Sequence, residues 1–306
     1  MSADTAPRPP GHPVVALSIA GSDPSGGAGI QADLKTFAAL GGYGCAVVTG
    51  LTAQSTTGVT RVLPVPGEMV TAQLETLFAD VGVDTIKIGM TTDADVARAI
   101  AGALRALRHA GREPFVVLDP VMVATSGDRL LAPDAEAVLR DELLPLADLV
   151  TPNLPEAAVL LGTAPAHDTA EAADQARALR GLGPRFVLVK GGHLGGAESI
   201  DHLAGPGLGI DVSSRSGPAT DEVTALTAPR IPTRNTHGTG CTLSSACAVL
   251  RPAHDGWEPT VRAAKDYLTG ALRAADDLVI GGTGTAPPPW HGHGPLDHAH
   301  ATRTLG

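Results

Sequence analysis

The chain of 306 residues contains few aromatic side chains, few cysteines and few lysines. Aromatic residues make up 3% of it, so we expect a core of mainly aliphatic side chains. The three cysteines are odd in number and lack the paired spacing of metal ligands, which argues against a disulfide framework and favours a reducing compartment. Acidic residues outnumber basic ones, and the formal net charge of −10 argues against non-specific nucleic-acid binding, which requires a basic surface.

The sequence also lacks targeting signals and long hydrophobic runs. The first 13 residues, MSADTAPRPPGHP, have neither the charged nor the apolar region of a signal peptide. The apolar run 14–20 is too short to cross a bilayer. We therefore expect a cytoplasmic protein that has neither a membrane nor a nucleic acid as a partner.

Short apolar runs rich in β-branched residues alternate with stretches of helical character. The predicted strands are 14–20, 44–51, 85–88, 115–118, 149–151 and 186–190. The predicted helices are 30–40, 67–79, 93–110, 133–143, 170–182, 239–250 and 260–278. This alternation predicts an α/β fold in which helices cover both faces of a central, mostly parallel sheet. Residues 199–230 break the alternation and predict short antiparallel strands joined by a mobile loop.

We expect a single domain over residues 14–281. It lies between a disordered, Pro-rich N-terminal tail (1–13) and a low-complexity C-terminal tail (282–306). The C-terminal tail contains four histidines, whose irregular spacing among Gly and Pro predicts solvated surface rather than a metal site. These histidines are His291, His293, His298 and His300.

The sequence AGSDPSGGAGIQAD at 20–33 follows a predicted strand and opens a helix. This position places it at the carboxyl edge of the sheet, where open α/β folds bind ligands. Ile30, Leu34 and Phe37 predict the buried stripe of the helix. Asp33 lies roughly 60° from Ile30 around the helix, at the edge of that stripe. A half-buried carboxylate there either binds a substrate N–H or O–H or pairs with protein groups, and the sequence favours neither.

Polar residues also follow three later strands. Asp119 either holds Mg²⁺ beside a nucleotide or begins an Asp-Pro turn, which is the more common role of that dipeptide. Asn153 and Glu156 have the spacing of a helix capping box, which by itself explains that segment. Lys190 stands beside two glycines, an arrangement that favours contact with a phosphate over a surface turn.

The segment NTHGTGCT at 235–242 is the strongest functional signal. A loop becomes a helix there, so backbone N–H groups and the positive end of the helix dipole favour an anion, most often a phosphate. The residues at this point are Gly238, Thr239, Gly240 and Cys241. The helix start is expected to lower the pKa of the Cys241 thiol. Cys247 falls on the apolar stripe of the same helix and is expected to be structural.

Six runs occur in a characteristic order: AGSDPSGGAGIQADLKTF, KIGM, DPVM, TPNLPEA, VKGGH and NTHGTGCTLS. Together they resemble the hydroxymethylpyrimidine/phosphomethylpyrimidine kinases of thiamine biosynthesis, which belong to the ribokinase-like superfamily. The resemblance extends from residue 16 to about residue 278. Two features depart from the family pattern: a longer, Gly/Ser-rich segment at 203–230 and a Pro-rich insert before Trp290.

The resemblance implies two successive transfers from ATP, first to the hydroxymethylpyrimidine and then to its monophosphate. The residues implied to hold the pyrimidine are Ala28, Asp33, Gln54, Met90 and Val117. ATP is implied to lie near Asn153, Lys190 and the loop 238–241, with Mg²⁺ near Asp119 and Glu156. Cys241 stands where sugar kinases of the superfamily carry an aspartate base. A homodimer is suggested by the resemblance alone.

Two other functions compete with this interpretation. A pyridoxal kinase of the same superfamily phosphorylates a similar flat ring with a hydroxymethyl group, but Gln54 and Met90 favour the pyrimidine. A pyrimidine-binding regulator that has lost catalysis belongs to a different class. It predicts a damaged anion or metal site, whereas Gly238, Cys241 and Asp119 are all present.

Overall fold

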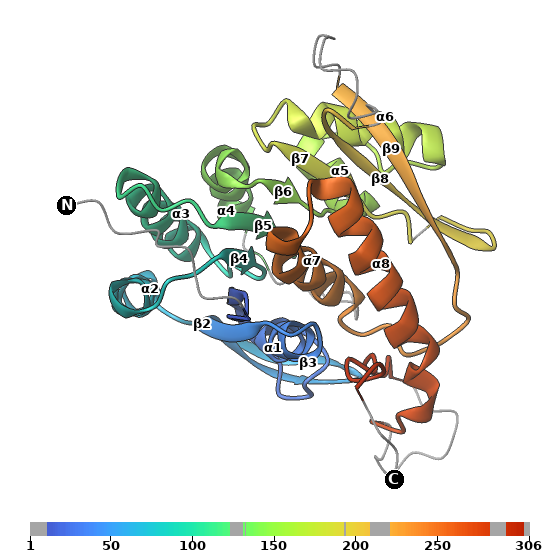
Figure 1. Ribbon diagram of the computed structural model, residues 1–306, viewed down its shortest axis with the longest axis horizontal. Coiled ribbons are helices and arrows are strands. Elements are labelled where there is room, and N and C mark those ends of the chain that lie inside the picture. The colour runs from blue at the N-terminus through green and yellow to red at the C-terminus, as the bar shows by residue number, and fades with distance from the viewer. Residues whose placement is uncertain are drawn as a thin grey trace.

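The computed structural model describes residues 11–122, 131, 133–192, 194–208, 221–281 and 292–302. Within these residues, nine strands form one sheet in the order β3-β2-β1-β4-β5-β6-β7-β8-β9 (Figure 1). The strands are β1 (Val15–Ser22), β2 (Tyr43–Ser55), β3 (Gly58–Pro64), β4 (Thr85–Ile88), β5 (Phe115–Leu118), β6 (Leu149–Val150), β7 (Phe186–Val189), β8 (Glu198–Pro206) and β9 (Asp221–Pro229).

The middle of the sheet is parallel and its two edges are antiparallel. Strands β2, β1, β4, β5, β6 and β7 run parallel, which confirms the predicted α/β sheet. The antiparallel strands expected within 199–230 are β8 and β9, while their connection at 209–220 lies outside the described residues. The hairpin of β2 and β3 was not predicted, because most of its outer half is exposed and shows no apolar run.

Helices cover both faces of the sheet. They are α1 (Gly29–Ala39), α2 (Gly67–Asp80), α3 (Ala94–His109), α4 (Pro133–Val138), α5 (Leu154–Leu161), α6 (Thr169–Arg180), α7 (Thr239–Leu250) and α8 (Trp257–Arg273). Helices α2 to α6 pack on one face in a mainly aliphatic core, as the composition predicts. Helices α1, α7 and α8 pack on the other (Figure 1). Helix α8 begins and ends earlier than predicted, since a 3₁₀ turn occupies Ala275–Asp277.

The buried face of α1 differs from the prediction. Its buried residues are Ala32, Asp33, Thr36 and Phe37, whereas Ile30 and Leu34 are only half-buried. Asp33 therefore lies on the buried face with no exposed surface, not half-buried at its edge. The apolar periodicity of α1 predicts the wrong face because small and polar side chains of α1, not its aliphatic ones, pack against α7.

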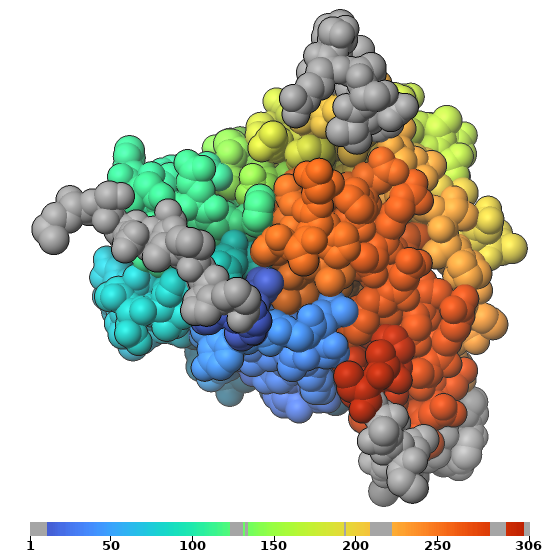
Figure 2. Space-filling view, viewed as in Figure 1, coloured from blue at the N-terminus to red at the C-terminus, as the bar shows by residue number. Residues whose placement is uncertain are grey.

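The C-terminal tail is not all solvated surface. His298 is 5% exposed, its Nε2 lies 2.9 Å from Thr242 Oγ1, and its carbonyl accepts a hydrogen bond of 2.8 Å from the Tyr267 hydroxyl. Figure 2 shows residues 292–302 beside α1 and α8. The prediction that the tail histidines lie on the solvated surface is therefore wrong for His298, whose ring is buried and has a polar partner in α7. His291 lies outside the described residues.

The predicted N-terminal tail falls mostly on residues 1–10, which lie outside the described part of the chain. All three cysteines are free thiols. Cys247 is fully buried in α7, as its place on the apolar stripe predicts. Among the helices described, none combines the length and apolar character needed to span a bilayer.

Candidate active site

A cavity of about 670 Å³ opens at the carboxyl ends of the parallel strands. Its walls come from the glycine-rich segment after β1, the end of β2, the loops after β4, β5, β6 and β7, and the helices α7 and α8. Most residues predicted for the site line it. These are Ala28, Gln54, Met90, Asp119, Asn153, Glu156, Lys190, Gly238, Thr239, Gly240 and Cys241.

Two predicted substrate residues do not line the cavity. Val117 is fully buried in β5 and packs in the core beside α7. Asp33 is also fully buried, and its oxygens accept hydrogen bonds from Ser18 at 2.6 Å, Ser245 at 2.7 Å and Lys87 at 2.9 Å. Of the two interpretations left open for Asp33, the structure shows the pairing with protein groups.

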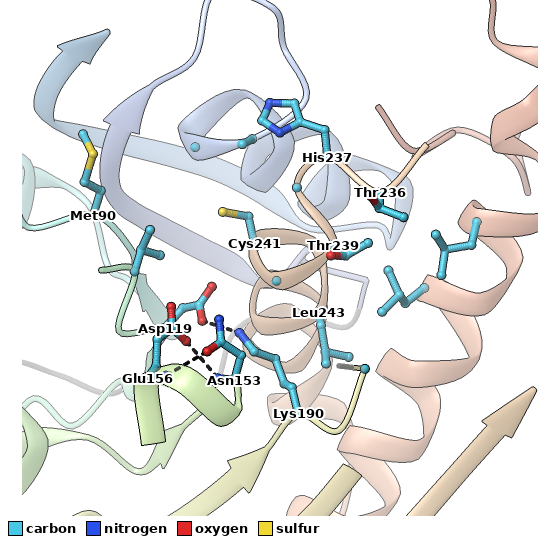
Figure 3. A pocket seen from close by; sticks show the side chains of 18 of the residues that line it. Met90, Asp119, Asn153, Glu156, Lys190, Thr236, His237, Thr239, Cys241 and Leu243 are labelled. Atoms are coloured by element: carbon cyan, nitrogen blue, oxygen red, sulfur yellow. Dashed lines mark hydrogen bonds and ion pairs between the residues drawn. The ribbon is translucent and has the colours of Figure 1, made fainter. Parts of the chain in front are cut away.

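The loop before α7 requires its glycines. Gly238 has φ of +83°, a left-handed conformation that favours glycine, and a Cβ there would lie 1.8 Å from the carbonyl oxygen of Gly27. At Gly240, a Cβ would lie 3.1 Å from Lys190 Nζ and 3.4 Å from Asp119 Oδ2. The start of this twelve-residue helix therefore stays open toward a lysine and an aspartate (Figure 3).

Asp119 and Lys190 form the charged centre of the cavity. Lys190 Nζ donates to Asp119 Oδ1 at 2.7 Å, and Thr151 donates to the same oxygen at 3.2 Å. Burial alone would lower the pKa of Lys190, but Asp119 and Glu156 outweigh it and raise the pKa. Lys190 thus remains a cation beside the start of α7, where it suits an anionic ligand.

Asn153 and Glu156 form the predicted capping box of α5. The Asn153 side chain accepts from the Glu156 backbone N–H at 2.9 Å, and the Glu156 carboxylate accepts from the Asn153 N–H at 2.8 Å. Burial raises the pKa of Glu156 to about 7, while the nearby Lys190 opposes the shift. The box therefore holds a carboxyl group beside Asp119 and Lys190, as Figure 3 shows.

The surroundings of Cys241 do not favour the low pKa expected for its thiol. Burial raises its pKa, which Lys87 partly counteracts, while the negative charges of Asp33 and Asp119 add to the rise. The helix start does not override the loss of water around the sulfur. The thiol is thus a weaker acid than its position in the sequence suggests.

Several residues that line the cavity were not among the predicted site residues. Lys87 lies in the buried strand β4 and still lines the cavity. His237 lies 2.7 Å from Asp23, and both line the cavity. A lysine within the apolar run TIKI was the available signal for Lys87. The Asp23–His237 pair gave no signal, because 214 positions separate the two residues.

The fold and site define a small-molecule kinase of the ribokinase-like superfamily. A family model described as phosphomethylpyrimidine kinase matches residues 23–288. The chain belongs to this family, in which ATP is the phosphate donor.

Named relatives agree with this assignment. The hydroxymethylpyrimidine/phosphomethylpyrimidine kinase of Escherichia coli K12 is 50% identical over 286 residues, covering 94% of this chain and 97% of the relative. A phosphomethylpyrimidine kinase of Clostridium difficile 630, known as a crystal structure, is 37% identical with a TM-score of 0.69, covering 85% of this chain and 99% of that one.

Pyridoxal kinases share the fold as well. The structure of the Staphylococcus aureus pyridoxal kinase in complex with AMP-PCP and pyridoxal has a TM-score of 0.77. It is 28% identical and covers 95% of each chain. The shared fold therefore accommodates more than one heteroaromatic substrate.

Proposed function

We propose that this protein phosphorylates 4-amino-5-hydroxymethyl-2-methylpyrimidine with ATP and then phosphorylates the monophosphate to the diphosphate, for thiamine biosynthesis. The observation that carries the proposal is the single cavity that joins the start of α7, the Lys190–Asp119 pair and the side chains of Gln54 and Met90. One end suits a phosphate and the other a flat polar ring, so both substrates fit one continuous space.

The phosphate end fits ATP on two grounds. The missing side chain of Gly240 leaves the first turn of α7 open toward Lys190, so backbone N–H groups and an ammonium face the same space. In phosphoryl transfer the protein acts mainly by positioning the reactants and neutralising charge. We assign to Lys190, Gly238, Thr239 and Gly240 the binding of the transferred phosphate, and to Asn153 a place beside the nucleotide.

Asp119 and Glu156 present the oxygen ligands that Mg²⁺ prefers. In the described residues no group of three His, Cys, Asp or Glu side chains is arranged to hold a metal. We therefore assign two carboxylates to Mg²⁺ and leave its other positions to phosphate oxygens and water, which is usual for this ion. When bound, Mg²⁺ neutralises charge on the phosphates.

The ring end carries the specificity. The Gln54 amide both donates and accepts hydrogen bonds, which matches the amino group and ring nitrogen of an aminopyrimidine. Met90 and Ala28 also line the cavity and offer apolar contact. Asp33 and Val117 do not line the cavity, so their direct contact with the ring rests on the family resemblance alone.

We assign to Cys241 the role of base for the hydroxymethyl group. The substrate O–H gives its proton to the Cys241 thiolate, its oxygen bonds to the γ-phosphorus, and the bond from that phosphorus to ADP breaks with its electron pair on ADP. The second transfer needs no strong base, because a phosphate is already anionic at neutral pH.

Product analysis with hydroxymethylpyrimidine and MgATP tests the proposal. We expect both the mono- and the diphosphate, each with stoichiometric ADP. Pyridoxal serves as the matched competitor, and faster turnover of pyridoxal would favour the pyridoxal kinase alternative that the structural neighbours raise. Binding of the pyrimidine and ATP without ADP release would instead indicate a non-catalytic regulator.

A further inference from the structure

We infer that Lys87 is a positioning residue that acts through Cys241: it supplies the positive charge that stabilises the Cys241 thiolate in the alcohol step. This inference rests on the proposed function, because it assumes that Cys241 accepts the substrate proton. It also makes a claim of its own about charge in the ligand-free protein, and that claim is testable without any phosphoryl transfer.

Lys87 is an unusual residue for a central parallel strand. It lies in β4 between β1 and β5 and has no exposed surface, yet its side chain lines the cavity that Cys241 also lines. A Cβ on Gly89 would lie 2.8 Å from Lys87 Nζ, so a glycine at this position leaves room for the amine. A buried ammonium carries a large desolvation cost and needs a compensating partner.

Asp33 is that partner and links Lys87 to α7. Lys87 Nζ lies 2.9 Å from both Asp33 oxygens. Ser245 of α7 donates to Asp33 at 2.7 Å. Ser245 is four residues after Cys241, so the two side chains stand on the same side of α7, one turn apart. Asp33 therefore holds the Lys87 amine against the side of α7 on which the Cys241 thiol lies.

Charged side chains from several elements act on the thiol: Lys87 from β4, Asp33 from α1 and Asp119 after β5, while Lys190 after β7 also interacts with the Cys241 charge. Of these, Lys87 has the largest effect and favours the thiolate, while the two aspartates oppose it. The interaction is reciprocal, because the Cys241 and Asp33 charges also raise the pKa of Lys87 against the effect of burial. Without Lys87, ionisation of this partly buried thiol would be harder still.

Alkylation of the thiols by iodoacetamide at pH 8, read by mass spectrometry for each cysteine, tests the charge directly. Lys87→Met should slow modification of Cys241 about tenfold, because the thiolate loses the positive charge of Lys87. Asp33→Asn should speed it. A purely structural role predicts no such opposite signs. The double variant should be slower than the wild type, since Lys87 has the larger effect.

The other two cysteines are internal controls. Cys45 lies in β2, which β1 separates from the strand of Lys87, so its alkylation rate should not change in any variant. Cys247 has no exposed surface and reports unfolding, because it becomes reactive only in a molecule that opens. If Cys247 is alkylated in Lys87→Met, that variant does not fold. The Asp33→Asn and double variants then still show whether the Cys241 alkylation rate rises or falls.

A kinetic cycle then connects the charge to the reaction. Lys87→Met should lower kcat for the alcohol substrate with little change in KM for ATP. The same substitution should cost nothing further in a Cys241→Ala background, because Lys87 acts through the thiol. Equal alkylation of Cys241 in all folded variants, or additive kinetic losses, would overturn the inference. Full activity of Cys241→Ala with the expected alkylation series would instead refute only the proposed base.

Discussion

The side chains of Asp23 and His237 lie 2.7 Å apart and join two loops that line the cavity. Asp23 follows β1 and also accepts from the backbone N–H groups of Ser25 at 2.8 Å and Ala28 at 2.9 Å. Burial alone would raise the pKa of Asp23, but hydrogen bonds from His237 and Ser25 lower it. The carboxylate therefore stays ionised and holds the loop after β1 to His237, just before α7.

His237→Asn should separate these loops, because the shorter amide does not reach Asp23 in the same way. We expect a KM for the pyrimidine at least about threefold higher and a loss of about 3 kcal/mol in the free energy of unfolding, since a buried charge loses its partner. Steady-state kinetics and urea unfolding measure both. His109→Asn, at the exposed end of α3, is the matched control. Unchanged KM and stability would contradict the role of the pair.

Cys241→Ala should impair the alcohol step more than the phosphate step. Loss of a general base typically costs a factor of 10² to 10⁴, so we expect about a hundredfold lower kcat with hydroxymethylpyrimidine. With the monophosphate as substrate, the loss should stay below about tenfold. Rapid-quench assays of each step measure this ratio, and Cys45→Ala is the control. Equal losses in both steps would refute the proposed division between them.

Gly240→Ala should damage phosphate binding without unfolding the protein. The added methyl group would lie 3.1 Å from Lys190 Nζ, in the space that we assign to the transferred phosphate. We expect kcat/KM for ATP to fall at least about tenfold. Gly102→Ala, whose methyl group meets nothing within 4 Å in α3, should leave the kinetics unchanged and stabilise the helix by about 0.5 to 1 kcal/mol. Normal ATP kinetics in Gly240→Ala would place the phosphate elsewhere.

His298 should make folding sensitive to mild acid. Burial lowers its pKa to about 4, below the usual 6.5, so the unfolded chain binds the proton more readily than the folded one. The folded protein should therefore lose about 2 kcal/mol between pH 7 and pH 5 from this group, and the loss should continue toward pH 4. Urea unfolding of the wild type and of His298→Gln across this range isolates the contribution. Parallel pH profiles would show that His298 is not the cause.

The sequence was most informative where one strand or one helix start is sufficient to make the feature. The apolar runs at 85–88 and 115–118 coincide with β4 and β5, because strands buried on both faces are continuously apolar. The capping box of Asn153 and Glu156 forms as predicted, since its partners are three residues apart. Similarly, Gly238 before α7 has a left-handed backbone conformation, which is a local preference of glycine.

The errors have a common origin. The buried face of α1 was misplaced because Asp33, a charged residue, is stabilised there by Lys87, 54 positions away. His298 was assigned to the surface because its partners in α7 and α8 are remote in the sequence. The hairpin of β2 and β3 carries too little buried apolar surface to produce a periodic signal.

The sequence by itself determined the parallel α/β sheet, the glycine-rich junction of loop and helix at α7 and the order of the motifs that reveal the family. Those features depend on the periodicity of apolar residues and on local backbone preferences, which a linear pattern records. Only the tertiary structure decided that Cys241 is partly withdrawn from water, that Asp33 pairs with Lys87 and that Asp23 pairs with His237. Desolvation and charge pairing depend on which distant segments meet, because the energy of a buried charge is set by the groups packed around it.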